Sequence, residues 1–400
     1  MAKLNKRAVM LDDVYTIDEL QAALESRRLA GVTHLVLTGR NWGDAGVRVL
    51  LSSPHLATLR VLDLGENQIS AEGAALLAGS ELLSKLTTLK IQRNNLGDEG
   101  FKALAQSPHL AALTELDVHQ NNIGAGGAAA LAEGGALANL TSLRLYRNNL
   151  GAAGVRALAQ APQLAGLTAL DIDWNDLGDA GAQALADSPH LANLVSLNLG
   201  NNGIGAAGAR AIAGSANLRN LTTLNLGNNA IGAAGAQAIA ESPHLANLTT
   251  LNLGNNGIGA AGAQAVAASP HVGALQWLDL RSNAIGDDGL RALAAAPALR
   301  GLSSLYLGEN EIGAPGAQAL AGSANFAQLK ALYLWGNAVG DDGARALADS
   351  PHLANLTDLD LWGNRVTEEG AAALNDSPYL DKLMVLDIGK VDEDELDDEL

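Results

Sequence analysis

The Trp, Tyr and Arg side chains of this 400-residue chain are its best candidates for binding chemistry, because these residue types provide most of the energy of protein interfaces. Many of them follow a 27-residue spacing. Four sequence columns with this spacing, exemplified by Thr223, Asn225, Gly227 and Asn228, hold 56 of the 400 positions, so one or two of the ten Trp and Tyr would fall there by chance. Seven do: Tyr146, Trp174, Trp277, Tyr306, Tyr333, Trp335 and Trp362.

These residues fall into two groups that we predict to bind a partner. The C-terminal patch comprises Trp277, Arg281, Tyr306, Glu309, Tyr333, Trp335, Asp360 and Trp362. Within it, Trp335 and Trp362 share a column in adjacent repeats, and we expect the two rings to lie face to face. The N-terminal patch is rich in basic residues and comprises Lys90, Arg93, His119, Arg144, Tyr146, Arg147 and Trp174, beside Asp117, Asp171 and Asp173.

Both patches also have a purely structural interpretation. Neighbouring aromatic and charged side chains on parallel strands can stabilise the sheet without binding anything. In the repeats between the two patches, the second, third and fourth columns carry only Asn and Gly, for example Asn198, Gly200, Asn225 and Gly227. The partner-binding interpretation is preferred for Trp335 and Trp362, and the structural one stays open for both groups.

Other reactive residue types are placed where a structural role explains them. Six of the eight His residues lie in Ser-Pro-His turns, and only His244 and His271 of these are in adjacent repeats, which disfavours a metal site. Acidic pairs such as Asp287 with Asp288 are placed at expected helix starts, where carboxylates are favourable. The sequence contains no phosphate loop and no nucleophile motif. We therefore predict no catalytic residue, no metal and no cofactor.

A repeating unit must position all these side chains. The skeleton L-x-x-L-x-L-x-x-N-x-I-G-x-x-G-x-x-A-I-A starts fourteen times at 27-residue steps, from Val32 to Leu383. Alternating apolar residues predict a short strand, and the helical spacing that follows predicts a helix. Parallel strands lie about 4.8 Å apart and helices need roughly 10 Å, so the helix side should fan out and leave the strand side concave.

Three further columns are interpreted as structural. An Asn recurs in twelve consecutive units from Asn67 to Asn364, and its carboxamide can donate to and accept from backbone groups buried in the turn. Asp98, Asp179, Asp287 and Asp341 follow the turn Gly and are predicted to cap a helix N-terminus. Nine of the ten prolines share one column just past the helix, where the missing N–H ends it.

The L-x-x-L-x-L-x-x-N pattern resembles the ribonuclease-inhibitor-like class of leucine-rich repeat proteins, which includes Ran GTPase-activating protein and parts of cytoplasmic immune sensors. It is especially similar to bacterial members with SPHLANLTxLxLGxNxIGDxGAxALA units. The resemblance covers residues 32–391 and implies an α/β solenoid or horseshoe, with a parallel sheet on the concave face and helices on the convex face. It implies protein binding on the concave face. The uniform 27-residue units and the lack of Cys depart from that class.

The pattern also predicts the organisation of the chain. Residues 1–31 are expected to form an N-terminal helical cap, with Thr16 and Glu19 in a capping box. Thirteen repeats follow over residues 32–382, and residues 383–391 are expected to form a terminal strand or cap. The tail over residues 392–400 reads DEDELDDEL and is predicted to be disordered.

Composition limits the classes of partner and compartment. The formal net charge of −18 disfavours nucleic acid and anionic membranes, because phosphate groups are bound by clusters of Lys and Arg. The chain has no Cys, which excludes disulfides and thiol nucleophiles. The sequence shows neither a membrane-length apolar run nor a good signal peptide, so we expect a cytoplasmic protein. A monomer is favoured.

The function predicted from the sequence is a non-enzymatic scaffold that binds a protein or peptide with acidic and apolar features. One alternative is a GTPase-activating or other regulatory protein of the same class. A second is a structural or engineered repeat scaffold with no partner, which the near-identical units between Leu194 and Ala274 would fit. Carbohydrate binding by the tryptophans is a further, weaker alternative.

Overall fold

The structure is a computed structural model that describes residues 8–11, 14–25, 29 and 31–389. The chain divides into two compact units, unit 1 over Met1–Asn202 and unit 2 over Gly203–Leu400, and each is described by itself. The tail over residues 392–400, predicted to be disordered, lies outside the described residues.

Unit 1 alternates short strands and helices along its length. Its described strands are β1 (Ala8–Met10), β2 (His34–Val36), β3 (Val61–Asp63), β4 (Thr88–Lys90), β5 (Glu115–Asp117), β6 (Ser142–Arg144), β7 (Ala169–Asp171) and β8 (Ser196–Asn198). Its described α-helices are α1 (Ile17–Glu25), α2 (Gly43–Leu51), α3 (Ala71–Ala78), α4 (Gly97–Ala105), α5 (Ala125–Glu133), α6 (Gly151–Ala159) and α7 (Gly178–Ala186).

Unit 2 repeats the same alternation. Its described strands are β9 (Thr223–Asn225), β10 (Thr250–Asn252), β11 (Trp277–Asp279), β12 (Ser304–Tyr306), β13 (Ala331–Tyr333), β14 (Asp358–Asp360) and β15 (Val385–Asp387). Its described α-helices are α8 (Ala206–Gly214), α9 (Gly232–Glu241), α10 (Gly259–Ala268), α11 (Gly286–Ala294), α12 (Ala314–Ala321), α13 (Gly340–Ala348) and α14 (Glu368–Asn375).

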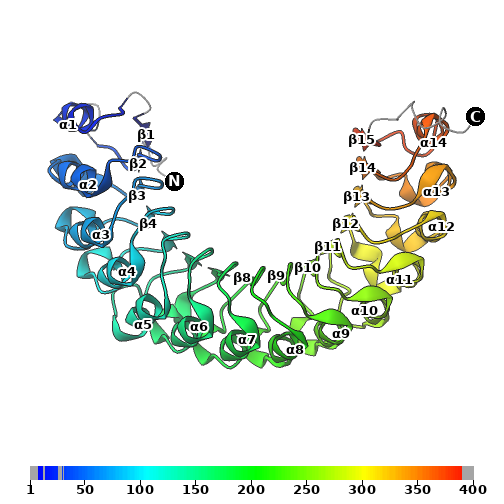
Figure 1. Cartoon of the computed structure of the whole chain (residues 1–400), viewed down its shortest axis with the longest axis horizontal. Helices are drawn as coiled ribbons and strands as arrows, with labels where there is room; N and C mark the ends of the chain where they lie inside the picture. The colour runs from blue at the N-terminus through cyan, green and yellow to red at the C-terminus, as the bar shows by residue number, and fades with distance from the viewer. Residues whose placement is uncertain (1–7, 12–13, 26–28, 30, 390–400) are drawn as a thin grey trace, which may run out of the picture. The chain divides into compact units, whose positions relative to one another are not determined.

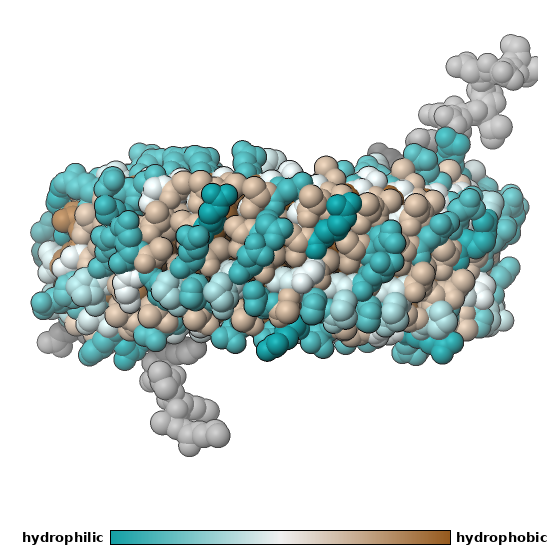
Figure 2. Space-filling view, turned by 90° about the horizontal axis from the view of Figure 1, so that it is seen from below, coloured by the Kyte–Doolittle hydropathy of each residue, from teal (hydrophilic) through white to brown (hydrophobic). Residues whose placement is uncertain are grey.

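Within each unit the strands pair in parallel and in chain order. The register places each residue beside the one 27 positions later, so Leu89 lies beside Leu116 and Lys90 beside Asp117. Figure 1 shows that in each unit, taken by itself, the strands line the inner side of the curve and the helices the outer side. The predicted α/β solenoid class is confirmed. Figure 2 looks onto the outer, helix-covered side, where hydrophilic side chains form slanted stripes with apolar strips between them.

The core of each rung is filled by the leucine columns of the strand and the inner face of the helix. In the rung of β4 and α4, Leu89, Phe101 and Leu104 are fully buried. The flanking Thr88 and Lys90 stay partly exposed on the strand face. Gly100 allows α4 to approach its neighbour, since a Cβ there would lie 3.1 Å from the Cα of Ala71. The strand face therefore presents the side chains that the core does not use.

The predicted Asn ladder is present. In Asn121, which is fully buried, Nδ2 donates to the backbone oxygens of Ile91 at 2.9 Å and Val118 at 3.1 Å. Its backbone N–H donates to Oδ1 of Asn148 at 3.0 Å. Its own Oδ1 accepts from the backbone N–H of Leu96 at 3.4 Å. Each carboxamide thus satisfies buried backbone groups on two rungs, as the sequence predicted.

The Asp residues after the turn Gly cap the next helix in the chain, whereas the sequence had assigned them simply to a helix N-terminus. Asp98 lies within the first turn of α4, but its Oδ1 accepts the backbone N–H of Gly124 at 2.6 Å, at the start of α5. Asp341 lies in α13, and its Oδ1 accepts the N–H groups of Thr367 at 2.8 Å and Gly370 at 3.2 Å, at the start of α14. These carboxylates therefore join neighbouring helices.

The N-terminal region contains the predicted capping box and one strand that was not predicted. The capping box of α1 is confirmed, because the N–H of Thr16 donates to Oε2 of Glu19 at 2.9 Å and the N–H of Glu19 donates to Oγ1 of Thr16 at 3.2 Å. The region predicted as a helical cap also holds a strand, β1, which pairs with β2.

Short 3-10 turns follow most α-helices, and many of them begin at the column prolines. The described turns are η2 (Pro54–Thr58), η3 (Glu81–Leu83), η4 (Pro108–Leu110), η5 (Pro162–Gly166), η6 (Pro189–Leu191), η7 (Ala216–Leu218), η8 (Pro243–Leu245), η9 (Pro297–Gly301), η10 (Ala324–Phe326) and η11 (Pro351–Leu353).

Candidate functional site

The strand-lined faces carry all ten sequence-predicted site residues, four in unit 1 and six in unit 2. The last of the four columns, to which Asn228 belongs, has an unusual backbone conformation. Its residues take a left-handed φ whatever their type, including 52° in Arg147, 54° in Trp174 and 55° in Asn228. Interstrand bonds hold this conformation, as in the N–H of Arg147, which donates to the oxygen of Asp173 at 2.9 Å. Sequence reasoning missed this feature because most residues in the column are not glycine.

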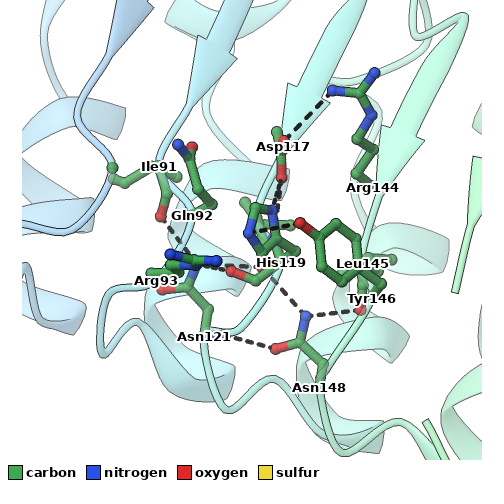
Figure 3. A network of polar contacts seen from close by, with 12 residues as sticks. Ile91, Gln92, Arg93, Asp117, His119, Asn121, Arg144, Leu145, Tyr146 and Asn148 are labelled. Atoms are coloured by element: carbon green, nitrogen blue, oxygen red, sulfur yellow. Dashed lines mark hydrogen bonds and ion pairs between the residues drawn. The ribbon is translucent and has the colours of Figure 1, made fainter. Parts of the chain in front are cut away.

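A buried polar network crosses the strand face of unit 1 (Figure 3). Nδ1 of His119 lies 2.7 Å from Oδ1 of Asp117, and Nε2 of His119 lies 2.8 Å from the hydroxyl of Tyr146. The rings of His119 and Tyr146 stack with centroids 3.9 Å apart. Arg144 lies 3.6 Å from both Asp117 and Glu115. The sequence placed Asp117, His119, Arg144 and Tyr146 in one patch but did not predict that they would bond to one another, and it did not include Glu115.

The network shifts the pKa values of its acidic members. Burial raises the pKa of Asp117, but the hydrogen bond and charge of His119 outweigh it, and the net shift is downward. Burial and the carboxylates of Asp117 and Asp171 raise the pKa of the Tyr146 hydroxyl. Burial raises the pKa of Asp171 to about 6, against the lowering effect of a hydrogen bond from the Asp173 backbone N–H and of the charge of Arg144, and with help from the charge of the Asp173 carboxylate.

The cations of the N-terminal patch are largely engaged by neighbouring side chains. Arg93 pairs with Glu66 at 2.8 Å. The guanidinium of Arg147 lies over the ring of Trp174, 5.6 Å from its centroid. Trp174 itself is 53% exposed. The patch is thus a strip of mixed charge with one exposed indole, and its basic character is weaker than the sequence alone indicates.

In unit 2 three aromatic side chains form a continuous run over β11, β12 and β13. The rings of Trp277 and Tyr306 have centroids 4.9 Å apart, and those of Tyr306 and Tyr333 stack at 4.4 Å. Arg281 lies 5.8 Å from the centroid of Tyr306. Burial raises the pKa of the Tyr333 hydroxyl, with help from Tyr306 and Asp358. The predicted clustering of these aromatics is therefore real.

The predicted stacking of Trp335 on Trp362 is wrong. The indole of Trp335 leans over Gly308 on the preceding rung. The indole of Trp362 leans the other way, so that a Cβ at Gly389 would lie 2.9 Å from its ring. Gly308 and Gly389 have no side chain, so each leaves room for the indole that leans over it. The two indole rings do not contact each other. Trp362 remains 55% exposed.

Arg281 is fixed by a fully buried carboxylate. Its Nε lies 3.0 Å and 2.9 Å from the two oxygens of Asp279, and its Nη2 lies 2.7 Å from Oδ2. Asp279 is 0% exposed. This bond raises the pKa of Arg281. The ion pair was missed in the sequence because Asp279 was not among the residues considered.

A hollow of about 250 Å³ opens beside this ion pair on the strand face of unit 2. Its walls are glycines, carboxamides, one hydroxyl, one guanidinium and one indole, from Gly227, Asn228, Asn252, Gly254, Asn255, Arg281, Ser282 and Trp335. Sequence reasoning treated the Asn and Gly rungs as featureless. The signal that could have found the hollow is the run of glycines in the third column, next to Trp335.

Other parts of the described chain offer less chemistry. A depression of about 570 Å³ lies on the helix side of unit 1, between α6 and α7, and none of the predicted site residues lines it. Among the described residues, no three His, Asp or Glu side chains come together as a metal site would require. None of the helices in the described ranges has the length and apolar character needed to cross a bilayer.

Comparison with known proteins connects this geometry to a family. The leucine-rich repeat family matches twelve segments of the chain, which are residues 55–78, 83–105, 109–132, 136–159, 167–186, 190–213, 217–240, 244–267, 275–294, 301–321, 328–348 and 352–374. A search of curated proteins found no match.

Two solved bacterial structures share the fold. An internalin from Listeria monocytogenes is 24% identical, with a TM-score of 0.61 and 94% of each chain covered. A leucine-rich repeat protein from Leptospira interrogans is 18% identical, with a TM-score of 0.54 and 96% of each chain covered. At these identities the likeness concerns the fold. Because the repeat segments cover well over half of its length, the chain belongs to the leucine-rich repeat family.

Proposed function

We propose that this protein is a non-enzymatic scaffold that binds a protein or peptide on the strand-lined face of unit 2. The observation that carries the proposal is the aromatic run of Trp277, Tyr306 and Tyr333, with the exposed Trp362 beyond it. Aromatic side chains with few rotatable bonds supply large contact areas at low entropic cost, and they dominate binding energies at protein interfaces. Leucine-rich repeat proteins in general act as binding scaffolds.

The chemistry of the partner follows from what surrounds the run. An apolar or aromatic segment of the partner would cover the rings of Tyr306 and Tyr333. An acidic partner segment would meet Arg281 beside the run, but the buried Asp279 already pairs with this guanidinium. Apolar contact is therefore expected to contribute more to the affinity than charge, and the affinity should depend only weakly on salt.

The structural alternative, in which the aromatics only brace the sheet, makes a different prediction. Sheet-bracing side chains should matter for stability, whereas binding side chains should matter for affinity. The exposure of Trp362 favours binding, because an indole that is more than half exposed contributes little to the core. No feature of the site favours the GTPase-activating alternative, since Arg281 and Arg144 are both held by carboxylates of their own unit.

The test uses the triple variant Tyr306→Ala, Tyr333→Ala, Trp362→Ala. Proteins captured from source cells by the full chain would be identified by mass spectrometry, purified and titrated against the wild type and the variant. We expect the variant to bind at least about 100-fold more weakly, since hot-spot aromatics cost roughly 2 kcal/mol or more each. The matched control is Tyr379→Ala, an exposed tyrosine outside the four columns, which should leave the Kd unchanged.

The two interpretations are separated by a parallel stability measurement. A triple variant that keeps its partner affinity but loses several kcal/mol of unfolding free energy would overturn the proposal in favour of sheet bracing. A wild-type chain that captures no partner specifically would favour the scaffold without a partner. The cytoplasmic location and the monomeric state stay predictions, which cell fractionation and light scattering test.

A further inference from the structure

The hollow in unit 2 is separate from the aromatic run and has a different chemical character. Its volume of about 250 Å³ is below the roughly 300 to 1,000 Å³ of pockets for drug-sized ligands, and it suits a compact ligand such as one sugar ring. Its floor lacks side chains at Gly227 and Gly254. A Cβ at Gly254 would lie 3.1 Å from a carboxylate oxygen of Asp279, so a larger residue would both crowd the ion pair and fill the space.

The walls of the hollow present polar atoms that have no hydrogen-bond partner among the described residues. Asn252 accepts from the N–H of Gly254 through Oδ1 at 2.8 Å, which leaves its Nδ2 available. Asn255 donates through Nδ2 to Oδ1 of Asn228 at 2.9 Å, which leaves the Oδ1 of Asn255 and the Nδ2 of Asn228 available. The hollow therefore offers donors and acceptors side by side, as a ligand with several hydroxyl groups requires.

The charges around the hollow select against an anionic ligand. Arg281 is neutralised by the buried Asp279, to which it bonds through Nε and Nη2, and its Nη1 remains as a donor. Ser282 donates to Oε2 of Glu309 at 2.7 Å, which places a further carboxylate nearby. An anion would meet this excess of negative charge. A neutral ligand avoids that penalty.

One wall of the hollow is the indole of Trp335. The faces of aromatic rings carry partial negative charge, and the C–H groups on one side of a pyranose ring are weakly positive, so the two pack well together. Trp335 leans over Gly308 and away from Trp362, and its indole is part of the lining of the hollow. A sugar presents one apolar surface and one hydroxylated surface. The indole complements the first, and the carboxamides complement the second.

We propose that this hollow binds one residue of a neutral carbohydrate, with Trp335 packing on the sugar ring and Asn228, Asn252, Asn255 and Arg281 hydrogen-bonding its hydroxyl groups. The proposal does not depend on the protein partner proposed above, since the hollow is lined by residues outside the run of Trp277, Tyr306 and Tyr333. The triple variant that tests the protein partner spares all of the lining residues.

The experiment applies the labelled full chain to an array of neutral, sialylated and sulphated glycans. Any glycan that is retained is then titrated, with saturation-transfer NMR to identify the bound ring. Two variants disrupt the hollow, Trp335→Ala and Asn255→Trp. The second fills the space without straining the backbone, because Asn255 has a φ of 52° and Trp174 occupies the same column with a φ of 54°. Its matched control is Asn201→Trp, at the same column position in unit 1, also with a φ of 52°.

We expect retention of neutral glycans, with the affinity reduced at least about tenfold by both hollow variants and changed less than about twofold by Asn201→Trp. Circular dichroism establishes that each variant is folded, and Trp335→Ala keeps the test decisive if Asn255→Trp does not fold. The proposal is overturned if the wild type retains no neutral glycan, if it prefers the charged glycans, or if a folded Trp335→Ala variant binds as well as the wild type.

Discussion

The charged side chains on the strand face of unit 1 are largely compensated by ion pairs with one another. Asp117 is only 5% exposed, and a carboxylate at that depth is costly unless its charge is compensated. His119 and Arg144 supply that compensation. By contrast, Arg147 has no ion-pair partner among the described residues and rests on the ring of Trp174. Of the predicted N-terminal patch, this arginine and its tryptophan are therefore the pair best placed to meet a partner.

Asp171 gives a prediction at the residue scale, because its pKa is raised to about 6 by burial. An unfolded Asp has a pKa of about 3.9, so between about pH 4 and pH 6 the unfolded chain loses a proton that the folded chain keeps. Ionisation therefore lowers the free energy of unfolding over this range, and the loss is complete above it. We expect Asp171→Asn to raise the unfolding free energy by roughly 1 to 2 kcal/mol at pH 7.

The measurement is denaturant unfolding of the wild type and the variant at several pH values. The stabilisation should shrink as the pH falls and vanish near pH 4, where Asp171 is protonated in both states. Asp176→Asn, at an exposed position nearby, is the control and should change stability by less than about 0.5 kcal/mol at every pH. A stabilisation that does not depend on pH would mean that the effect of Asp171→Asn is not electrostatic.

At the scale of elements, the helices of this solenoid start in two ways. Some, such as α4 and α6, begin at a glycine with a left-handed φ of 57°. Others, such as α5 and α14, begin after an extended residue whose turn receives a carboxylate from the preceding helix. In the second kind, the free N–H groups of one helix are satisfied by a neighbour, so a single Asp stabilises the contact between two rungs as well as a helix end.

Asp341 allows this inter-rung capping to be tested. It accepts the N–H groups of Thr367 and Gly370 and the hydroxyl of Thr367, all at the start of α14. Loss of a capping side chain costs about 1 kcal/mol, within a range of 0.5 to 2. We expect Asp341→Ala to lower the unfolding free energy by that amount and to speed amide exchange at the start of α14 more than in α13.

The neighbouring Asp342 provides the control for Asp341. Its carboxylate is 76% exposed and pairs with Arg345 at 2.9 Å on the same helix, so Asp342→Ala should cost less than about 0.5 kcal/mol. Burial raises the pKa of Asp341, but the bonds from Thr367 and Gly370 outweigh it and the net shift is downward. The stabilisation is therefore present above pH 4 and lost as the pH falls through the lowered pKa. Equal costs for the two alanine variants would contradict inter-rung capping.

Much of this fold could be predicted because the same residue pattern recurs in every rung, so that each rung supports the interpretation of the others. The leucine columns, the Asn ladder and the capping box of Thr16 and Glu19 all follow from local pattern, and the structure confirms them. The strand β1 was missed because it precedes the repeat and has no periodic signal of its own. The partner of Asp98 was missed because a pattern shows which residue can cap but not which helix its side chain faces.

The candidate site was less predictable for a related reason. The columns showed which side chains share the strand face, and the clustering of Trp277, Tyr306 and Tyr333 followed. Side-chain rotamers decide whether neighbours touch, and these are not encoded in the spacing. Trp335 and Trp362 have equivalent places in adjacent rungs and yet lean apart, because each finds a glycine on its other side.

For the molecule as a whole, stability should accumulate rung by rung. Each rung contacts its neighbours within a unit, so a repeat protein behaves approximately as a one-dimensional array of coupled parts. Damage to one rung should therefore weaken nearby rungs more than distant ones. A globular domain behaves differently, because its single core unfolds cooperatively.

Leu116 in β5 tests this property, since it is fully buried in the middle of unit 1. Leu116→Ala should cost about 2 to 5 kcal/mol, the usual penalty for a truncated core leucine. Hydrogen exchange read by mass spectrometry should show the largest loss of protection in β4, β5 and β6, declining toward both ends of unit 1. Uniform loss of protection across residues 31–202 would instead show that the unit unfolds as one body.

The left-handed column has a consequence for how this protein can change over generations. Its backbone conformation is the same in Arg93, Trp174, Asn228 and Ser282, so residues of very different size and charge fit there, although the described positions hold no β-branched residue and no proline. A single nucleotide change at such a codon alters what the strand face presents while the scaffold is inherited unchanged. Substitutions in this column can therefore change the binding surface one residue at a time with little effect on the fold.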